Sequence, residues 1–275
     1  MNKNPNTAKN KPQVSVITVC YNSEHAIEKT LISVTGQVYE NIEYIIIDGG
    51  STDKTNEIIQ KYRDQIDLWI SEKDEGIYDA MNKAVALAKG EWINFMNAGD
   101  TFRDNQVIKD IFDKTRTLGE QVIYGKSINI YPTFTQKGTI LKPDQMWKAM
   151  PINHQAMFMK TKVLQKYGFD QKYRFAADYD LIMRLKTDHI SFIFIDQFIS
   201  MVDCIDSTSV KNILQSISER KEIATRNGSN LKIRLYYFLL VSRIKLFRVV
   251  KKMIPASWTN RIVKLRHYKT QFVPR

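Results

Sequence analysis

The sequence predicts an α/β fold in which a mostly parallel sheet is covered by helices on both faces. In residues 1–100, short apolar runs rich in β-branched residues alternate with segments whose apolar residues recur every three or four positions. The runs are continuously apolar, which is typical of strands buried on both faces. Polar residues follow each run, where ligands bind to sheets of this kind.

Four strands and three helices are expected in this first half, in strict alternation. The expected strands are Val14–Val19, Tyr44–Ile47, Leu68–Ile70 and Trp92–Met96. The helices between them are indicated by Ile27, Leu31 and Val34, by Ile58, Ile59, Tyr62 and Ile66, and by the segment Ile77–Ala88. Such strand–helix–strand units favour parallel pairing, because each helix returns the chain across the sheet.

The second half is less regular. Strands are expected at Val122–Ile130, Ala156–Met159 and Ser191–Asp196, and helices at Tyr179–Lys186 and Val210–Asn227. Gly228-Ser229-Asn230 is the clearest break in the chain. We therefore expect a disordered tail over residues 1–12, a globular domain over residues 13–228 and a basic helical extension over residues 229–275.

The positive charge of the protein is concentrated in that extension. The chain carries 41 Lys and Arg against 29 Asp and Glu, a net charge of +12. Residues 231–275 contain twelve basic and no acidic residues, which leaves 29 of each sign in residues 1–230. A neutral body with a cationic appendage argues against a globally basic nucleic-acid-binding protein.

The extension mixes these charges with apolar residues, which predicts an amphipathic helix in the headgroup plane of an anionic membrane. The alternative is a helical hairpin that packs on the domain or on a second subunit of a homodimer. Its longest apolar run, Leu235–Val241, is too short to span a bilayer, which takes about 20 residues. With only two cysteines and no apolar leader, a cytoplasmic location at the inner face of the cell membrane is expected.

Acidic, amide and aromatic residues follow the four expected strands. Tyr21 and Asn22 follow the first, Asp48 the second, and Asn97 and Asp100 the fourth; Asp74 follows the third. A ring can flank a base, and a carboxylate can accept the imide N–H of uracil or thymine. Carboxylate and amide oxygens also suit Mg²⁺ or Mn²⁺, which bridge a diphosphate. Each residue alone is accounted for by a turn or a helix cap, but the set indicates a nucleotide site.

Two absent motifs and two alternatives narrow the function. No G-x-G-x-x-G follows the first strand and no G-x-x-x-x-G-K-[ST] occurs, which disfavours dinucleotide enzymes and P-loop NTPases. A nucleic-acid-binding module would use the basic extension, but the acids at the strand ends would repel phosphates. A nucleotidyltransferase would carry a Gly-rich, basic loop after the first strand, and this chain has none.

Four ordered segments resemble the donor half of glycosyltransferase family 2, an inverting group with the Rossmann-like GT-A fold. They are residues 14–22 (VSVITVCYN), 45–53 (IIIDGGSTD), 74–83 (DEGIYDAMNK) and 90–100 (GEWINFMNAGD). The resemblance covers residues 13–205 and is strongest to enzymes of bacterial surface-polysaccharide and lipopolysaccharide synthesis. It implies a nucleotide-sugar half over residues 13–100 and an acceptor half over residues 101–210.

The resemblance also implies roles for individual residues. It implies that four residues bind the nucleotide base and ribose: Thr18, Tyr21, Asn22 and Asp48. It also implies that Asp74 and Asn82 line the donor pocket. The metal motif of the family is Asp-x-Asp, but here Asn97 and Gly99 stand at its two acidic positions. Asp100 is then the only carboxylate left to bind the expected Mn²⁺ or Mg²⁺, so the motif is weaker than usual.

The catalytic base is implied by residues 175–184 (FAADYDLIMR), which resemble the Glu-Asp motif of the family with Ala177 in place of the glutamate. Asp178 aligns with the aspartate that acts as general base, and Asp180 is the alternative. Without the resemblance, Asp178 would be assigned as a helix N-cap.

Three further residues are candidates for contact with the acceptor or the diphosphate. His154 and Gln155 precede an expected strand, and Arg184 lies one to two helical turns after Asp178. A loop histidine and a salt-bridged arginine are the alternatives. Taken together, the sequence predicts an inverting hexosyl- or N-acetylhexosaminyltransferase that moves a sugar from a UDP-sugar to a lipid-linked saccharide.

Overall fold

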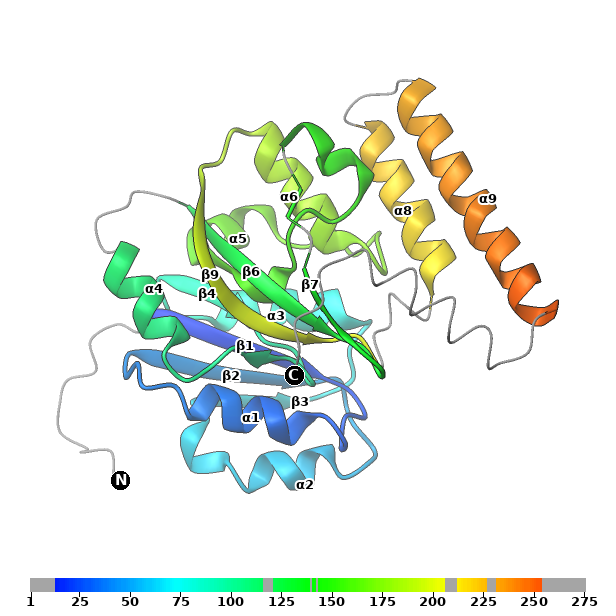
Figure 1. Ribbon diagram of the computed structural model, residues 1–275. Helices are drawn as coiled ribbons and strands as arrows, with labels where there is room; N and C mark the ends of the chain where they lie inside the picture. The colour runs from blue at the N-terminus through cyan, green and yellow to red at the C-terminus, as the bar shows by residue number, and fades with distance from the viewer. Residues whose placement is uncertain are drawn as a thin grey trace.

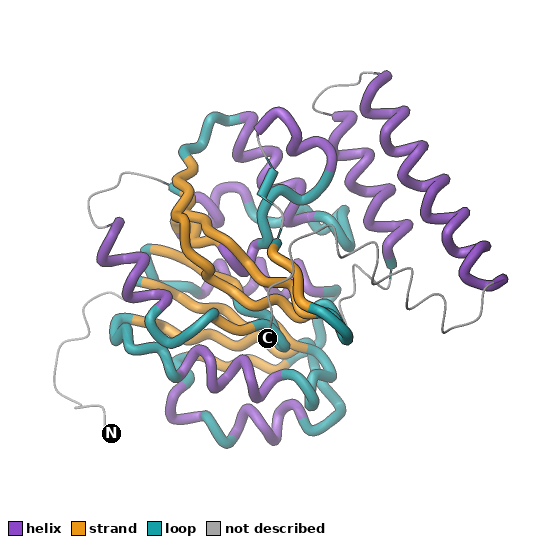
Figure 2. Tube along the Cα trace, in the orientation of Figure 1, coloured by secondary structure: helices purple, strands orange, loops and turns teal. Residues whose placement is uncertain are grey.

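A single mixed sheet forms the centre of the protein in the computed structural model (Figures 1 and 2). The structure describes residues 13–115, 121–138, 140–141, 143–205, 212–226 and 231–253. Within these ranges the strand order is β3-β2-β1-β4-β8-β6-β9-β5, with β7 paired to β6. The tail expected over residues 1–12 and the end of the extension, residues 254–275, lie outside the described residues.

The first half of the sheet is parallel, as the sequence predicts. Its strands are β1 (Val14–Cys20), β2 (Ile42–Asp48), β3 (Leu68–Ser71) and β4 (Trp92–Phe95). Its helices are α1 (Ile27–Thr35), α2 (Thr55–Gln60) and α3 (Ile77–Leu87). The helix expected to continue to Ile66 ends at Gln60 instead, and a short 3-10 helix, η1 (Arg63–Gln65), follows it.

The second half is mixed and holds more elements than the sequence predicts. The strands are β5 (Thr101–Phe102), β6 (Val122–Ile130), β7 (Thr135–Lys137), β8 (Met157–Lys160) and β9 (Phe192–Asp203). The helices are α4 (Val107–Thr115), α5 (Thr161–Tyr167) and α6 (Ala177–Thr187), with 3-10 helices η2 (Pro143–Lys148) and η3 (His154–Ala156). β8 is antiparallel to both β4 and β6, while β9 is parallel to β6.

Two apolar cores cover the two faces of the sheet. Successive residues of β1 point to opposite faces, so that Ile17 and Val19 pack with α3, α5 and α6, whereas Val16 and Cys20 pack with α1, α2 and α4. All four side chains are buried. This two-sided burial explains why the strands are continuously apolar in sequence.

The strand order reverses beside β1. The chain runs outward from β1 to β2 and β3, then returns to place β4 on the other side of β1. Ligands of open α/β sheets bind at such a reversal, beyond the carboxyl ends of the strands. The polar residues that follow β1 and β4 lie at this position.

The C-terminal helices α8 (Ile213–Arg226) and α9 (Leu231–Met253) pack side by side against the domain (Figure 1). Ile217 of α8 and Tyr237 of α9 are buried in a third apolar cluster that includes Trp147. The Tyr237 hydroxyl donates to the Trp147 carbonyl at 2.9 Å. The inner face of α9 is thus part of a packed hairpin. Among the described residues, no helix is long and apolar enough to cross a membrane.

Candidate active site

Asp48 ends β2 in a fully buried position and organises the loop that follows. Its Oδ2 accepts hydrogen bonds from Ser51 N–H at 2.9 Å, Ser71 Oγ at 2.6 Å and Asn56 Nδ2 at 3.1 Å. Burial opposes ionisation, but the hydrogen bonds from Ser51, Ser71 and Asn56 outweigh it and lower the pKa of Asp48. The carboxylate therefore holds the loop in shape, and its oxygens face protein donors.

Asp74 brings a second carboxylate to the same edge. A Cβ atom on Gly49 would lie 2.5 Å from Asp74 Oδ2, so only glycine at this position allows the approach. Asp74 Oδ1 accepts the Gly76 N–H at 2.9 Å, and the residue is half-buried. Of the two carboxylates, Asp74 is the one that solvent or a ligand can reach.

The residues at the end of β1 divide between an exposed ring and supporting contacts. Tyr21 is 61% exposed. Asn22 adopts φ of 46°, and its Oδ1 accepts the Thr52 N–H at 2.9 Å, which ties this loop to the one after β2. Thr18 is fully buried and donates to the Met96 carbonyl at 2.8 Å. Thr18 and Asn22 therefore support the loops at this edge of the sheet, and the Tyr21 ring is open to solvent.

The loop after β4 is held in place by hydrogen bonds to a side chain of α1. Thr30 Oγ1 donates to the Asp100 carbonyl at 2.7 Å and accepts the Gly99 N–H at 2.9 Å. The Asp100 side chain accepts from Gln155 Nε2 at 2.7 Å and from the Asp203 N–H at 2.8 Å. Burial raises the pKa of Asp100 to about 6. Both of its oxygens are engaged with protein.

A chain of hydrogen bonds crosses from the end of β4 to α6. Asn97 Nδ2 lies 3.1 Å from His154 Nε2, and His154 Nδ1 lies 3.2 Å from Asp178 Oδ2. Asp178 Oδ1 in turn accepts from the Tyr78 hydroxyl at 3.1 Å and from the Tyr179 N–H at 2.8 Å. Burial opposes ionisation of Asp178, but the hydrogen bonds from His154, Tyr179 and Tyr78 outweigh it and lower its pKa. The structure thus brings together three of the residues singled out in the sequence.

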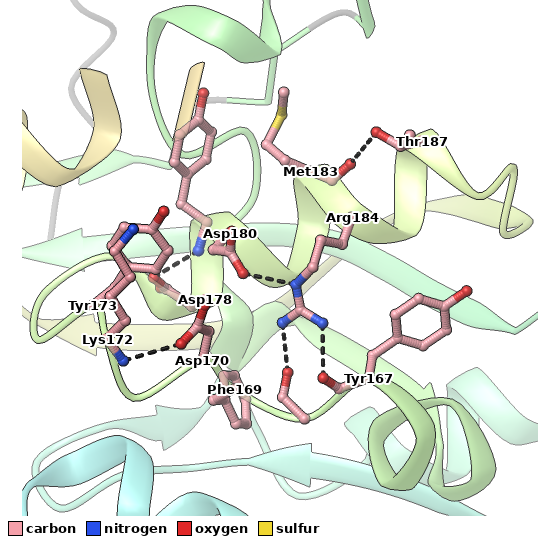
Figure 3. A network of polar contacts seen from close by, with 12 residues as sticks. Tyr167, Phe169, Asp170, Lys172, Tyr173, Asp178, Asp180, Met183, Arg184 and Thr187 are labelled. Carbon is pink, nitrogen blue, oxygen red and sulfur yellow. Dashed lines mark hydrogen bonds and ion pairs between the residues drawn. The ribbon is translucent and has the colours of Figure 1, made fainter. Parts of the chain in front are cut away.

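Asp180 and Arg184 belong to a separate network, drawn in Figure 3. Asp180 is fully buried and is paired with Arg184, at 2.7 Å from its Nε, and with Arg226 of α8. The other Arg184 nitrogens donate to the carbonyls of Tyr167 at 2.7 Å and Gly168 at 2.6 Å. Arg184 is therefore a salt-bridged arginine, which was the alternative to contact with the acceptor or the diphosphate. Its N–H groups donate to protein groups.

Two other expectations change with the geometry. Asn82 exchanges both side-chain hydrogen bonds with the backbone of Phe169, each at 2.9 Å, and so joins α3 to the loop after α5. Asp178 lies inside the first turn of α6, whose N-cap position is Ala176. The N-cap alternative for Asp178 is therefore wrong.

The family model of glycosyl transferase family 2 matches residues 15–180, more than half of the chain. The chain belongs to glycosyltransferase family 2. It is therefore a transferase, and the nucleotidyltransferase and nucleic-acid-binding alternatives lose their basis.

Relatives and solved structures agree with this assignment. An uncharacterised glycosyltransferase of Mycobacterium tuberculosis is 31% identical over 181 residues, which cover 63% of this chain and 68% of the relative. A PGL/p-HBAD biosynthesis glycosyltransferase of Mycobacterium bovis is 28% identical over 181 residues, covering 63% and 69%.

Two structures share the fold. S. aureus TarS in complex with UDP-GlcNAc has a TM-score of 0.62 at 18% identity, covering 82% of this chain and 69% of TarS. The mannosyltransferase PcManGT of Pyrobaculum calidifontis, in complex with GDP-Man and Mn²⁺, has a TM-score of 0.61 at 17% identity, covering 82% and 67%. The GT-A fold expected from the sequence is confirmed.

The metal-binding residues expected of this family 2 glycosyltransferase do not form a ligand set in the described ranges. No group of three His, Cys, Asp or Glu there is arranged to hold a metal ion. Asp100 already accepts hydrogen bonds at both oxygens, and the neutral Asn97 contributes one buried oxygen, Oδ1, that has no hydrogen-bond partner. These residues do not fit a conventional metal centre, and we assign no chemical step to a metal.

Some residues of the site could not be singled out from the sequence. Tyr78 contacts Asp178 across a separation of 100 residues, and Thr30 fixes the β4 loop from 70 residues away. Ser51 and Asn56 lie only three and eight residues after Asp48 in the chain, and Ser51 belongs to the second family motif, residues 45–53. For Tyr78, only its place inside the third family motif was available.

Asp48→Asn should lower the free energy of unfolding by about 2–3 kcal/mol at pH 7, because a neutral amide accepts more weakly than a carboxylate and has one oxygen for the two positions that now accept hydrogen bonds. Since the folded pKa of Asp48 lies below its ordinary value of about 3.9, its stabilisation is present above that pH and is lost below it. Urea unfolding should show the loss shrinking as the pH falls below about 4. Exposed Asp64→Asn is the control, and an equal loss at both pH values would contradict the assignment.

Proposed function

We propose that this glycosyltransferase transfers a sugar, with inversion, from a UDP-sugar to a saccharide carried on a lipid. The observation that carries the proposal is the Asp178 carboxylate, which is held by Tyr78 and His154 and linked through His154 to Asn97 in the loop after β4. A base on one side of the donor site and a nucleotide-binding edge on the other are what a single displacement requires.

The nucleotide would lie along the ends of β1 and β2. The exposed Tyr21 ring is available to flank a base, and the accessible Asp74 carboxylate is available to accept an imide N–H. Asp48, Asn22 and Thr18 act indirectly, because their polar groups hold the loops in place. Uracil offers such an imide, and TarS, which shares the fold, was crystallised with UDP-GlcNAc. A hexose or N-acetylhexosamine is the sugar class we assign.

The transfer would proceed in one displacement at the anomeric carbon. The acceptor oxygen forms its bond to this carbon while the bond to the diphosphate breaks, and the diphosphate leaves with the electron pair. The acceptor proton passes to Asp178, whose lowered pKa keeps it ionised at neutral pH and whose side chain is 18% exposed. Asp180 cannot take this role, since its side chain is fully buried and is paired with both Arg184 and Arg226.

Dependence on Mn²⁺ or Mg²⁺ remains a prediction from the family resemblance. PcManGT was crystallised with Mn²⁺, which supports a divalent metal in the shared fold. In this chain Asp100 is the one carboxylate of the altered motif, and binding a cation would require it to give up its hydrogen bonds to Gln155 and Asp203. Binding of nucleotide sugars should therefore be measured both with and without Mn²⁺.

The outer face of α9 supports attachment to a membrane. At 3.6 residues per turn, its apolar side chains form two stripes on opposite sides of the helix. The inner stripe packs on α8 and Trp147. The outer stripe consists of residues that are each more than half exposed: Leu235, Phe238, Leu239, Leu246 and Val249. In Figure 1, α9 is the outermost element on its side of the protein, so this stripe faces away from the domain.

Basic residues border the outer stripe on both sides. The same helical spacing places Lys232 and Arg243 along one border and Arg234 and Lys245 along the other, and all four are exposed. An apolar stripe between two rows of cations matches the interface of an anionic bilayer. We propose that the extension over residues 229–275 attaches the enzyme to the inner face of the cell membrane, where a lipid-linked acceptor of cell-surface polysaccharide synthesis would be found.

A panel of nucleotide sugars tests the donor. UDP- and dTDP-sugars should raise the melting temperature of the protein, because a ligand at 100 times its Kd stabilises the folded state by about 2.7 kcal/mol. An ADP-sugar, which lacks the imide, should have a smaller effect, and Asp74→Asn should weaken the UDP response. The measurement is thermal unfolding with UDP-, GDP-, dTDP- and ADP-sugars, each with and without Mn²⁺. If no UDP compound changes the melting temperature, the proposed donor is wrong.

Asp178→Asn should reduce kcat at least about 100-fold, because the acceptor hydroxyl loses its proton acceptor. UDP affinity should stay within about threefold, since the amide oxygen can still accept from Tyr78. The measurement combines steady-state transfer with UDP titration. Asp170→Asn, on an exposed loop close in sequence, is the matched control and should retain wild-type kcat. Wild-type turnover in Asp178→Asn would disprove the assigned base.

Phe238→Gln should weaken binding to vesicles that contain anionic lipid by about tenfold, because it places an amide in the outer apolar stripe. Ile32→Gln, a similarly exposed position at 56% on α1, should bind like the wild type. Cosedimentation with anionic and neutral vesicles at low and high salt measures the effect. Light scattering in the absence of lipid provides the second readout: a change from dimer to monomer in Phe238→Gln would assign the stripe to a second copy of the chain and overturn the membrane proposal.

A further inference from the structure

His154 stands between the assigned base and the β4 loop, with both ring nitrogens engaged. Its Nε2 lies 3.1 Å from Asn97 Nδ2 and its Nδ1 lies 3.2 Å from Asp178 Oδ2, and only 14% of the side chain is exposed. In the structure the Asn97 amide turns its Nδ2 toward the ring, and because an amide nitrogen only donates, Nε2 accepts from Asn97 in this arrangement. The ring proton of the neutral imidazole then resides on Nδ1 and is donated to Asp178.

The segment that carries His154 is anchored to β4. Asn94, fully buried in β4, donates from Nδ2 to the carbonyls of Gln155 at 3.2 Å and Met157 at 2.8 Å. Gln155 also binds the Asp100 side chain at 2.7 Å. The backbone beside His154 is held by β4, and the Asn97 that contacts its ring lies in the loop after β4. The imidazole therefore has one defined orientation toward α6.

The hydrogen bonds to Asp178 leave one acceptor position on its carboxylate. Oδ1 accepts from both the Tyr78 hydroxyl and the Tyr179 N–H, which uses its two lone pairs. Among the residues that the structure describes, only His154 donates to Oδ2, so one lone pair of Oδ2 remains. Any acceptor hydroxyl that approaches Asp178 must therefore use that lone pair, and the His154 N–H sets the direction in which it points.

We propose that His154 is a positioning residue for glycosyl transfer: held by Asn97, it donates from Nδ1 to Asp178 Oδ2 and aims the remaining lone pair at the acceptor hydroxyl. The inference rests on the proposed function, because Asp178 must be the proton acceptor. It also gives Asn97 a role that an aspartate at the same position would not have. A carboxylate there could not donate to Nε2, and it would instead draw a second proton onto the ring.

Three substitutions separate this role from a purely structural one. The amide nitrogen of Asn in His154→Asn can occupy the place of Nδ1, whereas Gln in His154→Gln extends its amide toward the place of Nε2. We expect His154→Asn to keep kcat within about tenfold of the wild type, and His154→Ala and His154→Gln to lose about 100-fold. UDP affinity and the KM for donor should stay within about threefold in all three, because the ring is engaged by Asn97 and Asp178.

The tautomer provides a readout that does not depend on activity. The chain has four histidines, so comparison with His154→Asn identifies the His154 ring in a ¹⁵N NMR spectrum. We expect the Nδ1–H form in the wild type and a shift toward the Nε2–H form in Asn97→Ala. The Nε2–H form in the wild type would overturn the proposal, as would equal kcat in His154→Gln and His154→Asn, wild-type kcat in His154→Ala, or a loss confined to donor KM. A wild-type protein that binds no nucleotide sugar but has the Nδ1–H form would instead refute the proposed function.

Discussion

The structure depends on the pairing of β1 with β2 on one side and β4 on the other. Because β1 is central, its two faces are buried under helices. The loops at its end and at the end of β4 lie at the same edge of the sheet, where the Ala98 N–H donates to the Val19 carbonyl at 3.2 Å. The same pairing sets the position of His154, since η3 is fastened to β4 through Asn94. The residues proposed to bind the donor and the proposed base, Asp178, are thus positioned by the same two paired strands, β1 and β4.

Polar residues around this strand pair fall into two groups. Asp48, Asn22, Thr18 and Asn82 direct their hydrogen bonds to the backbone and side chains of neighbouring loops. Tyr21 and Asp74 present a ring and a carboxylate with accessible surface, whereas the exposed Asn22 uses its amide oxygen to accept the Thr52 N–H. Buried polar groups must find partners, and the loops of this site require many of them to keep their shape. A family motif therefore contains two kinds of residue. Some are available to contact the ligand, and others hold the loops that carry the first kind in place.

Local patterns revealed the parallel half of the fold, because strands buried on both faces are continuously apolar. They failed for β9, where Asp196 and Gln197 interrupt the run although the strand continues to Asp203 beside β6. In the site, the residue types after each strand were visible, but their burial was not, so Asp48 and Asp74 could not be ranked. Asn97, His154 and Asp178 are separated by 57 and 24 residues, and only folding brings them into one chain of hydrogen bonds.

The two stripes of α9 have a consequence for how the enzyme can be handled. Ending the protein before Leu231 would remove the outer stripe, but it would also strip the cover from Ile217, Ala224 and Trp147, which pack against the inner one. Truncation would remove one exposed apolar surface but create another on the glycosyltransferase domain itself. A well-behaved variant is better sought by replacing outward-facing side chains of α9 one at a time and leaving the helix in place.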